Sequence, residues 1–290
     1  MTMRVRCTTL TAMALLIASA PGRPLHSQVA ADRMEALVQA DRSAAAASWK
    51  LGLRGALLEA CDRDGVLLLP GAPLVTGTPD ALRDLTDAPS PLSSKVTWDP
   101  LGLEISSDSS VALMWGAASL PTDAEVPTPG RFVCMWEYST STWKIAALVL
   151  QGPVFAYRGA DIATAGKTPP RRHSEKFFQA DRDFARLAAD SGASIAFQRW
   201  AAPEAMMFGS RGFIIRGRET IGKAVDGPAT WSWAPVAGGG SPAGDLGWTV
   251  GDAVIAPAEG TPVRTKYLTV WRVQPDGSIR FIVDAGNPRP

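Results

Sequence analysis

An internal repeat is the feature of this sequence that most restricts its fold. Gln39-Ala40-Asp41-Arg42 recurs as Gln179-Ala180-Asp181-Arg182, an offset of 140 residues. The same offset relates three further pairs without a gap: Gly52 and Gly192, Ala56 and Ala196, and Gly77 and Gly217. After a loop of different length the offset becomes 135, and it relates Trp98-Asp99-Pro100 to Trp233-Ala234-Pro235, Gly116 to Gly251, and Trp136 to Trp271. Such an ordered series indicates two copies of one domain.

The bulk composition is compatible with two small cores. The chain has 290 residues, of which 46% are hydrophobic. Residues 153–172 contain Gly159, Gly166, Pro169 and Pro170 with little apolar periodicity, which is typical of a linker. We therefore place the domains at 29–152 and 173–290. Basic and acidic residues nearly cancel, at 29 against 28, so nucleic-acid binding is not favoured.

The N-terminal segment has the order of residues that a secretory signal requires. Arg4 and Arg6 precede the uncharged apolar residues 10–20, which end in the small-x-small sequence Ala18-Ser19-Ala20. This predicts a signal peptide over 1–28, and an uncleaved membrane anchor is the alternative. The apolar stretch is shorter than the about 20 residues of a transmembrane helix, and no later stretch is long and apolar enough to span a bilayer. We expect an exported protein, periplasmic or secreted, with no other contact with a membrane.

Cysteine and histidine residues restrict the chemistry. Cys61 and Cys134, which follow the predicted signal, could pair in an oxidising compartment, but two separately buried thiols are the favoured interpretation. His26 and His173 lie at the domain edges, so a nucleophile activated by histidine in the core is not expected. No Asp, Glu and His residues cluster at metal-ligand spacing. The sequence predicts neither a metal nor a cofactor.

Within each copy, the pattern predicts two helices, a short strand, a short helix and three long strands. Helical spacing of Phe177, Asp181, Phe184 and Ala188 indicates the first helix. The second is expected over 193–200, and Thr78-Pro79-Asp80 would begin the short helix of the first copy. Strands are expected over 248–256, 266–273 and 279–284, and Gly238-Gly239-Gly240-Ser241 is interpreted as a flexible hairpin loop. Helices gathered ahead of an antiparallel sheet predict the α+β class.

Several segments of the second copy together resemble a known family. They are QADRDF at 179–184, WAAPEA at 200–205, RGRETI at 216–221, GDLGWTVG at 244–251, YLTVWR at 267–272 and DAGNP at 284–288. The second copy is similar throughout to SnoaL-like domains of the nuclear transport factor 2-like (NTF2-like) superfamily, from its uncharacterised exported branch. The first copy is more divergent. The resemblance implies a curved antiparallel sheet wrapped around helices, which leaves a conical apolar pocket. It also implies that the two sheets pack face to face as an intrachain pseudo-dimer in a monomeric protein.

The best-known enzyme on this fold, ketosteroid isomerase, uses a carboxylate base, a tyrosine and a protonated acid. The corresponding positions fall near Gly209 and Leu69 for the base, Ala185 and Ala45 for the tyrosine, and Thr269 and Cys134 for the acid. Neither copy keeps any of the three groups. An isomerase of that type is not expected, and whether the chain is an enzyme stays open.

Asp284 is the main candidate for a functional carboxylate. Alternation along the last strand places it on one face with Ile282, and the resemblance implies that this face lines the pocket. Among Phe184, Trp200 and Trp271 its pKa would be raised by desolvation, which suits a base or a group that orients a ligand.

Structural roles are the alternative for all three recurrent or buried carboxylates. Asp284 could instead cap a turn at Gly286-Asn287, or pair with Arg182 or Arg280, because buried carboxylates are usually paired. Asp41 and Asp181 are expected to cap a neighbouring loop or pair with an arginine.

Three functions remain. The first is binding of a small hydrophobic molecule in the cone of the second domain, by Phe184, Trp200, Tyr267, Thr269, Trp271 and Ile282. The second is a lyase, isomerase or hydrolase acting on a small hydrophobic substrate with Asp284 as base. The third is a structural or interaction role for the paired domains. Closed cones in both copies would remove the first two, and we expect the second copy to keep the better pocket.

Overall fold

The computed structural model describes residues 25–72, 74–77, 82, 95–120, 128–152, 173–209 and 213–289. Most of the predicted signal, the predicted linker and the helix expected from Thr78 lie outside the described residues. The first helix begins at Leu25, four residues before the predicted start of the first domain. Within these ranges, no helix has the length and apolar character needed to cross a membrane.

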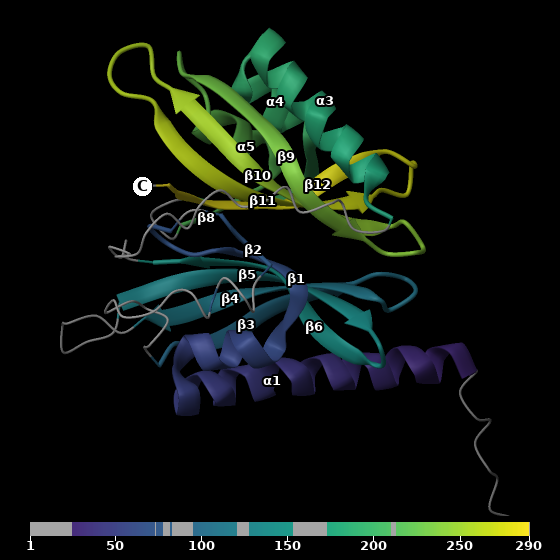
Figure 1. The fold of residues 1–290 in the computed structure, drawn as a ribbon. Coiled ribbons are helices and arrows are strands. Elements are labelled where there is room, and N and C mark those ends of the chain that lie inside the picture. The colour runs from purple at the N-terminus through teal and green to yellow at the C-terminus, as the bar shows by residue number, and fades with distance from the viewer. Residues whose placement is uncertain are drawn as a thin grey trace, which may run out of the picture.

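Two six-stranded sheets with the same strand order make up most of the fold (Figure 1). The first, in the order β2-β1-β6-β5-β4-β3, contains β1 (Cys61–Leu68), β2 (Val75–Thr76), β3 (Thr97–Ile105), β4 (Val111–Leu120), β5 (Thr128–Ser139) and β6 (Thr142–Gln151). The second, in the order β8-β7-β12-β11-β10-β9, contains β7 (Ala201–Phe208), β8 (Ile214–Arg216), β9 (Thr230–Gly240), β10 (Leu246–Ala256), β11 (Val263–Val273) and β12 (Ile279–Pro288). The predicted α+β class and tandem duplication are confirmed, although each sheet is mixed because β1 and β7 run parallel to their neighbours β6 and β12.

The helices of the two domains also correspond. They are α1 (Leu25–Ala60) in the first domain, and α3 (Glu175–Ser191), α4 (Ala193–Trp200) and α5 (Arg218–Ala224) in the second. The long α1 is broken at Gly52, which has φ 74° and ψ 168°, and Gly192 separates α3 from α4 with φ 89° and ψ 157°. Only glycine adopts this region readily. The repeat therefore preserves the position at which the chain leaves its first helix and begins the second.

The predicted number of long strands was wrong. Each domain has four, because β3 and β9 precede the three that the pattern indicated. Gly238-Gly239-Gly240, predicted to be a flexible loop, ends β9 and pairs with Gly247-Trp248-Thr249 of β10. A Cβ atom on Gly238 would come within 2.6 Å of the Phe178 ring. The glycines are there because aromatic rings of α3 pack directly on this strand, which a loop pattern does not reveal.

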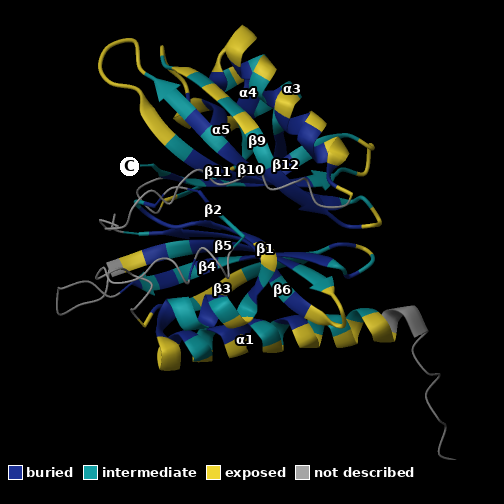
Figure 2. Cartoon of the chain, in the orientation of Figure 1, coloured by how far each residue is buried: buried dark blue, intermediate teal, exposed yellow. Residues whose placement is uncertain are grey.

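The two sheets face each other, and the helices cover their outer faces (Figures 1 and 2). The facing side chains form one buried apolar cluster that includes Val149 and Val283. Gln151 and Asn287 occupy the same position in the two pairings with β5 and β11, and both are buried.

Corresponding hydrogen bonds cross between the sheets. The Gln151 amide donates to the carbonyls of Phe208 and Gly286, at 2.9 and 2.7 Å. The Asn287 amide donates to the carbonyls of Leu68 and Leu150, at 2.7 and 2.9 Å. The Arg272 guanidinium also contacts Glu104 of the first domain at 3.1 Å.

Candidate functional site in the second domain

A cavity of about 410 Å³ lies between the concave face of the second sheet and its helices. Its wall is mainly aromatic and aliphatic, with Phe184 from α3, Phe197 from α4, Phe208 from β7, and Trp231 and Trp233 from β9. Pockets of this size and character hold small molecules in many proteins. The curved sheet leaves this space because α3 and α4 cover only part of its concave face.

Aromatic side chains close the narrow end of the cone. Phe184 is at the centre, with its ring centroid 4.7 Å from that of Trp233 and 4.8 Å from that of Phe197. Trp200 and Trp271 pack behind it, at 6.3 and 6.2 Å from Phe184. The pairs of Phe184 with Trp233, Phe197 and Trp271 are edge-to-face and the pair with Trp200 is tilted, and together they make the narrow end of the cone a filled core.

Three of the residues predicted to bind a ligand are therefore not part of the cavity wall. Trp271 is fully buried and donates to the Thr249 hydroxyl at 2.8 Å, and Trp200 borders an outer groove. Ile282 is the extra residue of a β-bulge, because Val270 pairs with Val283 whereas Trp271 pairs with Phe281. Simple alternation along β12 fails at this bulge. Phe184, Tyr267, Thr269 and Asp284 line the cavity, and their role in ligand binding or catalysis stays a prediction.

Asp181 lies beside the cavity and receives several hydrogen bonds. The Trp233 indole N–H donates to it at 2.7 Å and the Tyr267 hydroxyl at 2.9 Å, and the Thr249 hydroxyl also bonds to it. Burial raises the pKa of Asp181 to about 6, although these hydrogen bonds favour the ionised form. The expectation that Asp181 caps a loop or pairs with an arginine was wrong. Its partners are strand side chains, which the recurrence of both Asp and Trp in the repeat could have indicated.

Asp284 is half-buried on the cavity wall and accepts a hydrogen bond from the Thr269 hydroxyl at 2.7 Å. Burial raises the pKa of Asp284 to about 7; the bond from Thr269 opposes this shift, and the nearby Asp181 carboxylate adds to it.

The predicted structural partners of Asp284 have other contacts. Gly286 and Asn287 lie in β12 rather than in a turn. Arg182 pairs with Glu175, and Arg280 donates to the Arg199 carbonyl. No cationic side chain among the described residues forms an ion pair with Asp284.

Gly251 explains how the Tyr267 ring reaches Asp181. Gly251 of β10 pairs with Tyr267 of β11. A Cβ atom on Gly251 would lie 2.8 Å from the Tyr267 hydroxyl oxygen and 2.9 Å from a ring carbon. Glycine at this position lets the ring lie flat across the neighbouring strand. In the first domain Gly116 faces Phe132 in the same way.

Lys266 is an unusual buried cation at the edge of the cavity. Its side chain is fully buried, and its ammonium group donates to the carbonyls of Ala72 and Pro288. Burial lowers its pKa to about 7; nearby Arg289 lowers it further, and Asp252 opposes the shift. Because the hydrogen bond to Ala72 crosses to the first domain, Lys266 belongs to the contact between the domains.

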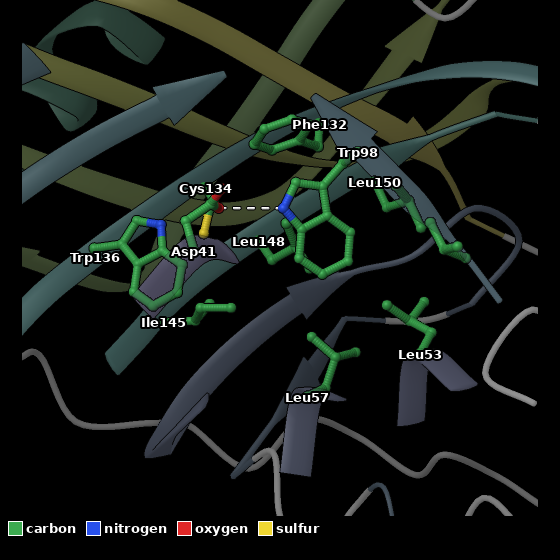
Figure 3. A pocket seen from close by; sticks show the side chains of 11 residues that line it. Asp41, Leu53, Leu57, Trp98, Phe132, Cys134, Trp136, Ile145, Leu148 and Leu150 are labelled. Atoms are coloured by element: carbon green, nitrogen blue, oxygen red, sulfur yellow. Dashed lines mark hydrogen bonds between the residues drawn. The ribbon is translucent and has the colours of Figure 1, made fainter. Parts of the chain in front are cut away.

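The corresponding cone of the first domain is closed (Figure 3). Its cavity is only about 20 Å³, room for about one water molecule. Leu53 and Leu57 from α1 fill the space against Phe132, Leu148 and Leu150 of the sheet. The Trp98 indole donates to Asp41 at 3.1 Å, the counterpart of the Trp233–Asp181 bond. Asp41, too, therefore has an indole partner where a capping or arginine contact was expected.

The two cysteines of the first domain are separate buried thiols, as favoured from the sequence. Cys134 lines the closed cone and Cys61 begins β1. Burial raises the pKa of both thiols well above the usual value. They are therefore protonated, and their role is packing.

The sequence matches no protein-family model and no curated protein. Solved structures similar to this chain include an NTF2-like protein with a cystatin-like fold from Novosphingobium aromaticivorans, at 17% identity over 40% of this chain and 81% of that protein, with a TM-score of 0.34. Another is an NTF2-like protein of unknown function from Shewanella oneidensis, at 15% identity over 40% of this chain and 97% of that protein, with a TM-score of 0.34. A third, from Mycobacterium tuberculosis, was crystallised with estradiol-17β-hemisuccinate. It has 14% identity over 37% of this chain and 89% of that protein, with a TM-score of 0.32.

Each of these proteins thus covers about the length of one of the two domains. The first two have the fold name that the sequence resemblance suggested. The chemistry of this chain must be inferred from its own residues. Among the described residues, no group of three or more His, Cys, Asp or Glu side chains is placed to hold a metal ion. The cavity instead combines an aromatic wall with one accessible carboxylate.

Proposed function

We propose that the second domain binds a small, mainly apolar molecule in its cone. The observation that supports this most directly is the cavity of about 410 Å³ beside a closed counterpart of about 20 Å³ in the same chain. An apolar space of this size leaves Trp231, Trp233 and Ile255 partly exposed to water unless a ligand covers them. The polar contribution from Asp284 and Thr269 would orient the ligand.

The test is a titration with the neutral dye Nile red, whose fluorescence rises in apolar surroundings. We expect saturable binding at one site. Ala253 lines the cavity, so Ala253→Trp fills it and should abolish binding while the thermal unfolding midpoint changes little. As the matched control, Ala36→Trp adds the same side chain to α1 beside the outer groove of the first domain, away from the cavity, and should leave dye binding unchanged. Equal binding by wild type and Ala253→Trp would contradict the proposal.

An enzyme is the second candidate, supported by the environment of Asp284. A wall carboxylate with a pKa of about 7 that pairs with no arginine among the described residues can act as a general base near neutral pH. The reaction class would be that of a lyase, isomerase or hydrolase on a small hydrophobic substrate. Asp284→Asn should then abolish turnover of a substrate found by screening while its affinity remains. Turnover that persists in this variant would exclude Asp284 as the base.

We also propose that the two domains act as an intrachain pseudo-dimer and that the protein is a monomer. The corresponding hydrogen bonds of Gln151 and Asn287 support this, since each amide donates to backbone carbonyls of the other domain, so that the two sheets pair within one chain. Light scattering after size exclusion should give the mass of one chain, and a dimer mass would contradict the proposal.

Export is proposed from the N-terminal pattern alone. Detection of the protein in the periplasm or medium, and its retention in the cytoplasm when residues 1–28 are removed, would test it.

A further inference from the structure

The polar end of the cavity, which we define as Asp181, Trp233, Tyr267, Thr269 and Asp284, has its hydrogen-bond donors already occupied. The Trp233 N–H and the Tyr267 hydroxyl both donate to Asp181. The Thr269 hydroxyl donates to Asp284. What remains available to a ligand is acceptor capacity, above all the second oxygen of Asp284, for which the described residues provide no donor. A ligand that reaches this end must therefore supply its own donor.

Nearby cations do not neutralise the polar end. Lys266 donates to the carbonyls of Ala72 and Pro288. Arg182, next to Asp181 in sequence, pairs with Glu175 on the exposed side of α3. Arg289 pairs with Asp252 at 2.8 Å. Asp181 and Asp284 therefore form no ion pair among the described residues, and when both are ionised a positive charge that enters the cavity would stabilise them.

The remainder of the wall suits a positive charge as well as an apolar body. Aromatic rings from five elements line the cavity: Phe184 from α3, Phe197 from α4, Phe208 from β7, Trp231 and Trp233 from β9, and Tyr267 from β11. Faces of such rings attract ammonium groups when water is excluded. The same rings pack well against a hydrocarbon or aromatic chain.

We propose that the ligand is a hydrophobic amine, whose protonated nitrogen donates to the Asp284 carboxylate and whose apolar part fills the aromatic cone. This inference rests on the proposed function and names its ligand class. It differs from a neutral ligand that accepts a hydrogen bond from a protonated Asp284, because only the amine brings both donors and charge to a site made of acceptors.

Three compounds of matched shape test the inference: 4-phenylbutylamine, 4-phenyl-1-butanol and 4-phenylbutyric acid. Their affinities are measured by Nile red displacement at pH 8. We expect the amine to bind roughly tenfold or more tightly than the alcohol, and the acid more weakly than both, as charge complementarity in a desolvated site predicts. Asp284→Asn should bring the amine and the alcohol within about threefold of each other. Asp41→Asn, which makes the same carboxylate-to-amide change in the closed cone at the counterpart of Asp181, should leave the tenfold preference intact.

The pH dependence gives a second readout. Asp181, Tyr267 and Lys266 are the titratable groups that face Asp284 or border its cavity, with Asp252 near Tyr267. The amine stays protonated between pH 5.5 and 8, whereas Asp284 ionises over this range. Amine affinity should therefore rise roughly tenfold from pH 5.5 to 8, and alcohol affinity should not.

The outcomes separate the two proposals. Equal amine and alcohol affinities in wild type, or Nile red binding without displacement by the amine, would overturn the amine inference and leave the binding function standing. Failure of Nile red itself to bind would remove the binding function, and the amine inference with it. A preference for the amine that survives Asp284→Asn would assign recognition to another group and also overturn the inference.

Discussion

The two cones of this protein have the same strand order, but one contains a cavity and the other is filled by side chains. Both keep an aspartate on the first helix bonded to a strand tryptophan, Asp41 to Trp98 and Asp181 to Trp233. At four equivalent positions in the strand registers, the open cone has a polar residue where the closed cone has an apolar or weakly polar one. The pairs of equivalent residues are Thr249 and Met114, Tyr267 and Phe132, Thr269 and Cys134, and Asp284 and Leu148. The Asp–Trp hydrogen bond is therefore part of the fold that both domains share, whereas the four positions that differ are part of the candidate site.

This difference shows how a polar cavity depends on a complete set of partners. Asp284 is accommodated because Thr269 donates to it and because the cavity gives access to water or a ligand. In the first domain, the position of the donor is a cysteine and the position of the acid is a leucine. A half-satisfied polar network is less stable than an apolar core. Once one partner is replaced, replacement of the others and closure of the cone become favourable.

The largest expected effect comes from forcing the site of the open cone into the closed one. Leu148→Asp would bury a carboxylate with neither a hydroxyl partner nor a cavity, so we expect a loss of about 4 kcal/mol in the free energy of unfolding at pH 8. The loss should be smaller at pH 5, where the new carboxyl can be protonated. Adding Cys134→Thr should recover about 1 kcal/mol. Urea unfolding at both pH values measures this, and no recovery by the second change would contradict the Thr–Asp pairing.

The two helix aspartates should differ when they are removed. Asp181→Ala leaves Trp233, Tyr267 and Thr249 without their acceptor, so we expect a loss of about 3 kcal/mol in unfolding free energy. Asp41→Ala removes the acceptor of Trp98, with an expected loss of about 1–2 kcal/mol. Equal losses, measured by urea unfolding at pH 8, would show that the larger network contributes nothing beyond the bond to the indole.

The two carboxyl groups of the open cone should make the stability of the protein depend on pH below about 7. The folded-state pKa of Asp284 is raised to about 7 and that of Asp181 to about 6, so between about pH 4 and 7 these two groups bind more protons in the native state than in the unfolded state. Burial also raises the pKa of Asp41 in the closed cone, which acts in the same direction. Unfolding free energy should therefore fall as pH rises from about 4 to about 7. Asp284→Asn should remove about 1–3 kcal/mol of this fall. If the wild-type and variant curves stay parallel from pH 4 to 8, Asp284 ionises normally.

The smallest change makes one position of the open cone identical to that of the closed cone. Tyr267→Phe removes one hydrogen bond to Asp181 and places there the residue found at Phe132, so we expect a loss of about 1 kcal/mol in unfolding free energy. Nile red should still bind, because the ring remains. Phe132→Tyr is the reverse exchange in a filled cone, and we expect it to destabilise the chain. Loss of dye binding in Tyr267→Phe would mean that its hydroxyl, as well as its ring, shapes the cavity.

Much of the frame could be predicted from the sequence because its signals are local. The helix predicted over 193–200 is α4, and Asp284, which alternation predicted to face the pocket, lies on the cavity wall. Prediction failed where packing overrides local pattern. Gly238 and Gly240 lie in a strand on which Phe178 and Phe177 pack directly, and Ile282 leaves the alternation because of a bulge.

By itself, the sequence determined the duplication, the α+β class, the order of most elements and the candidate carboxylate, since each depends on residue types at fixed short spacings. Only the tertiary structure decided which cone is open and what Asp181 binds. Its partners Trp233 and Tyr267 are 52 and 86 residues away along the chain. Whether a cone closes depends on the total volume of the side chains that the helices and the sheet bring together, and a local sequence pattern does not predict that volume.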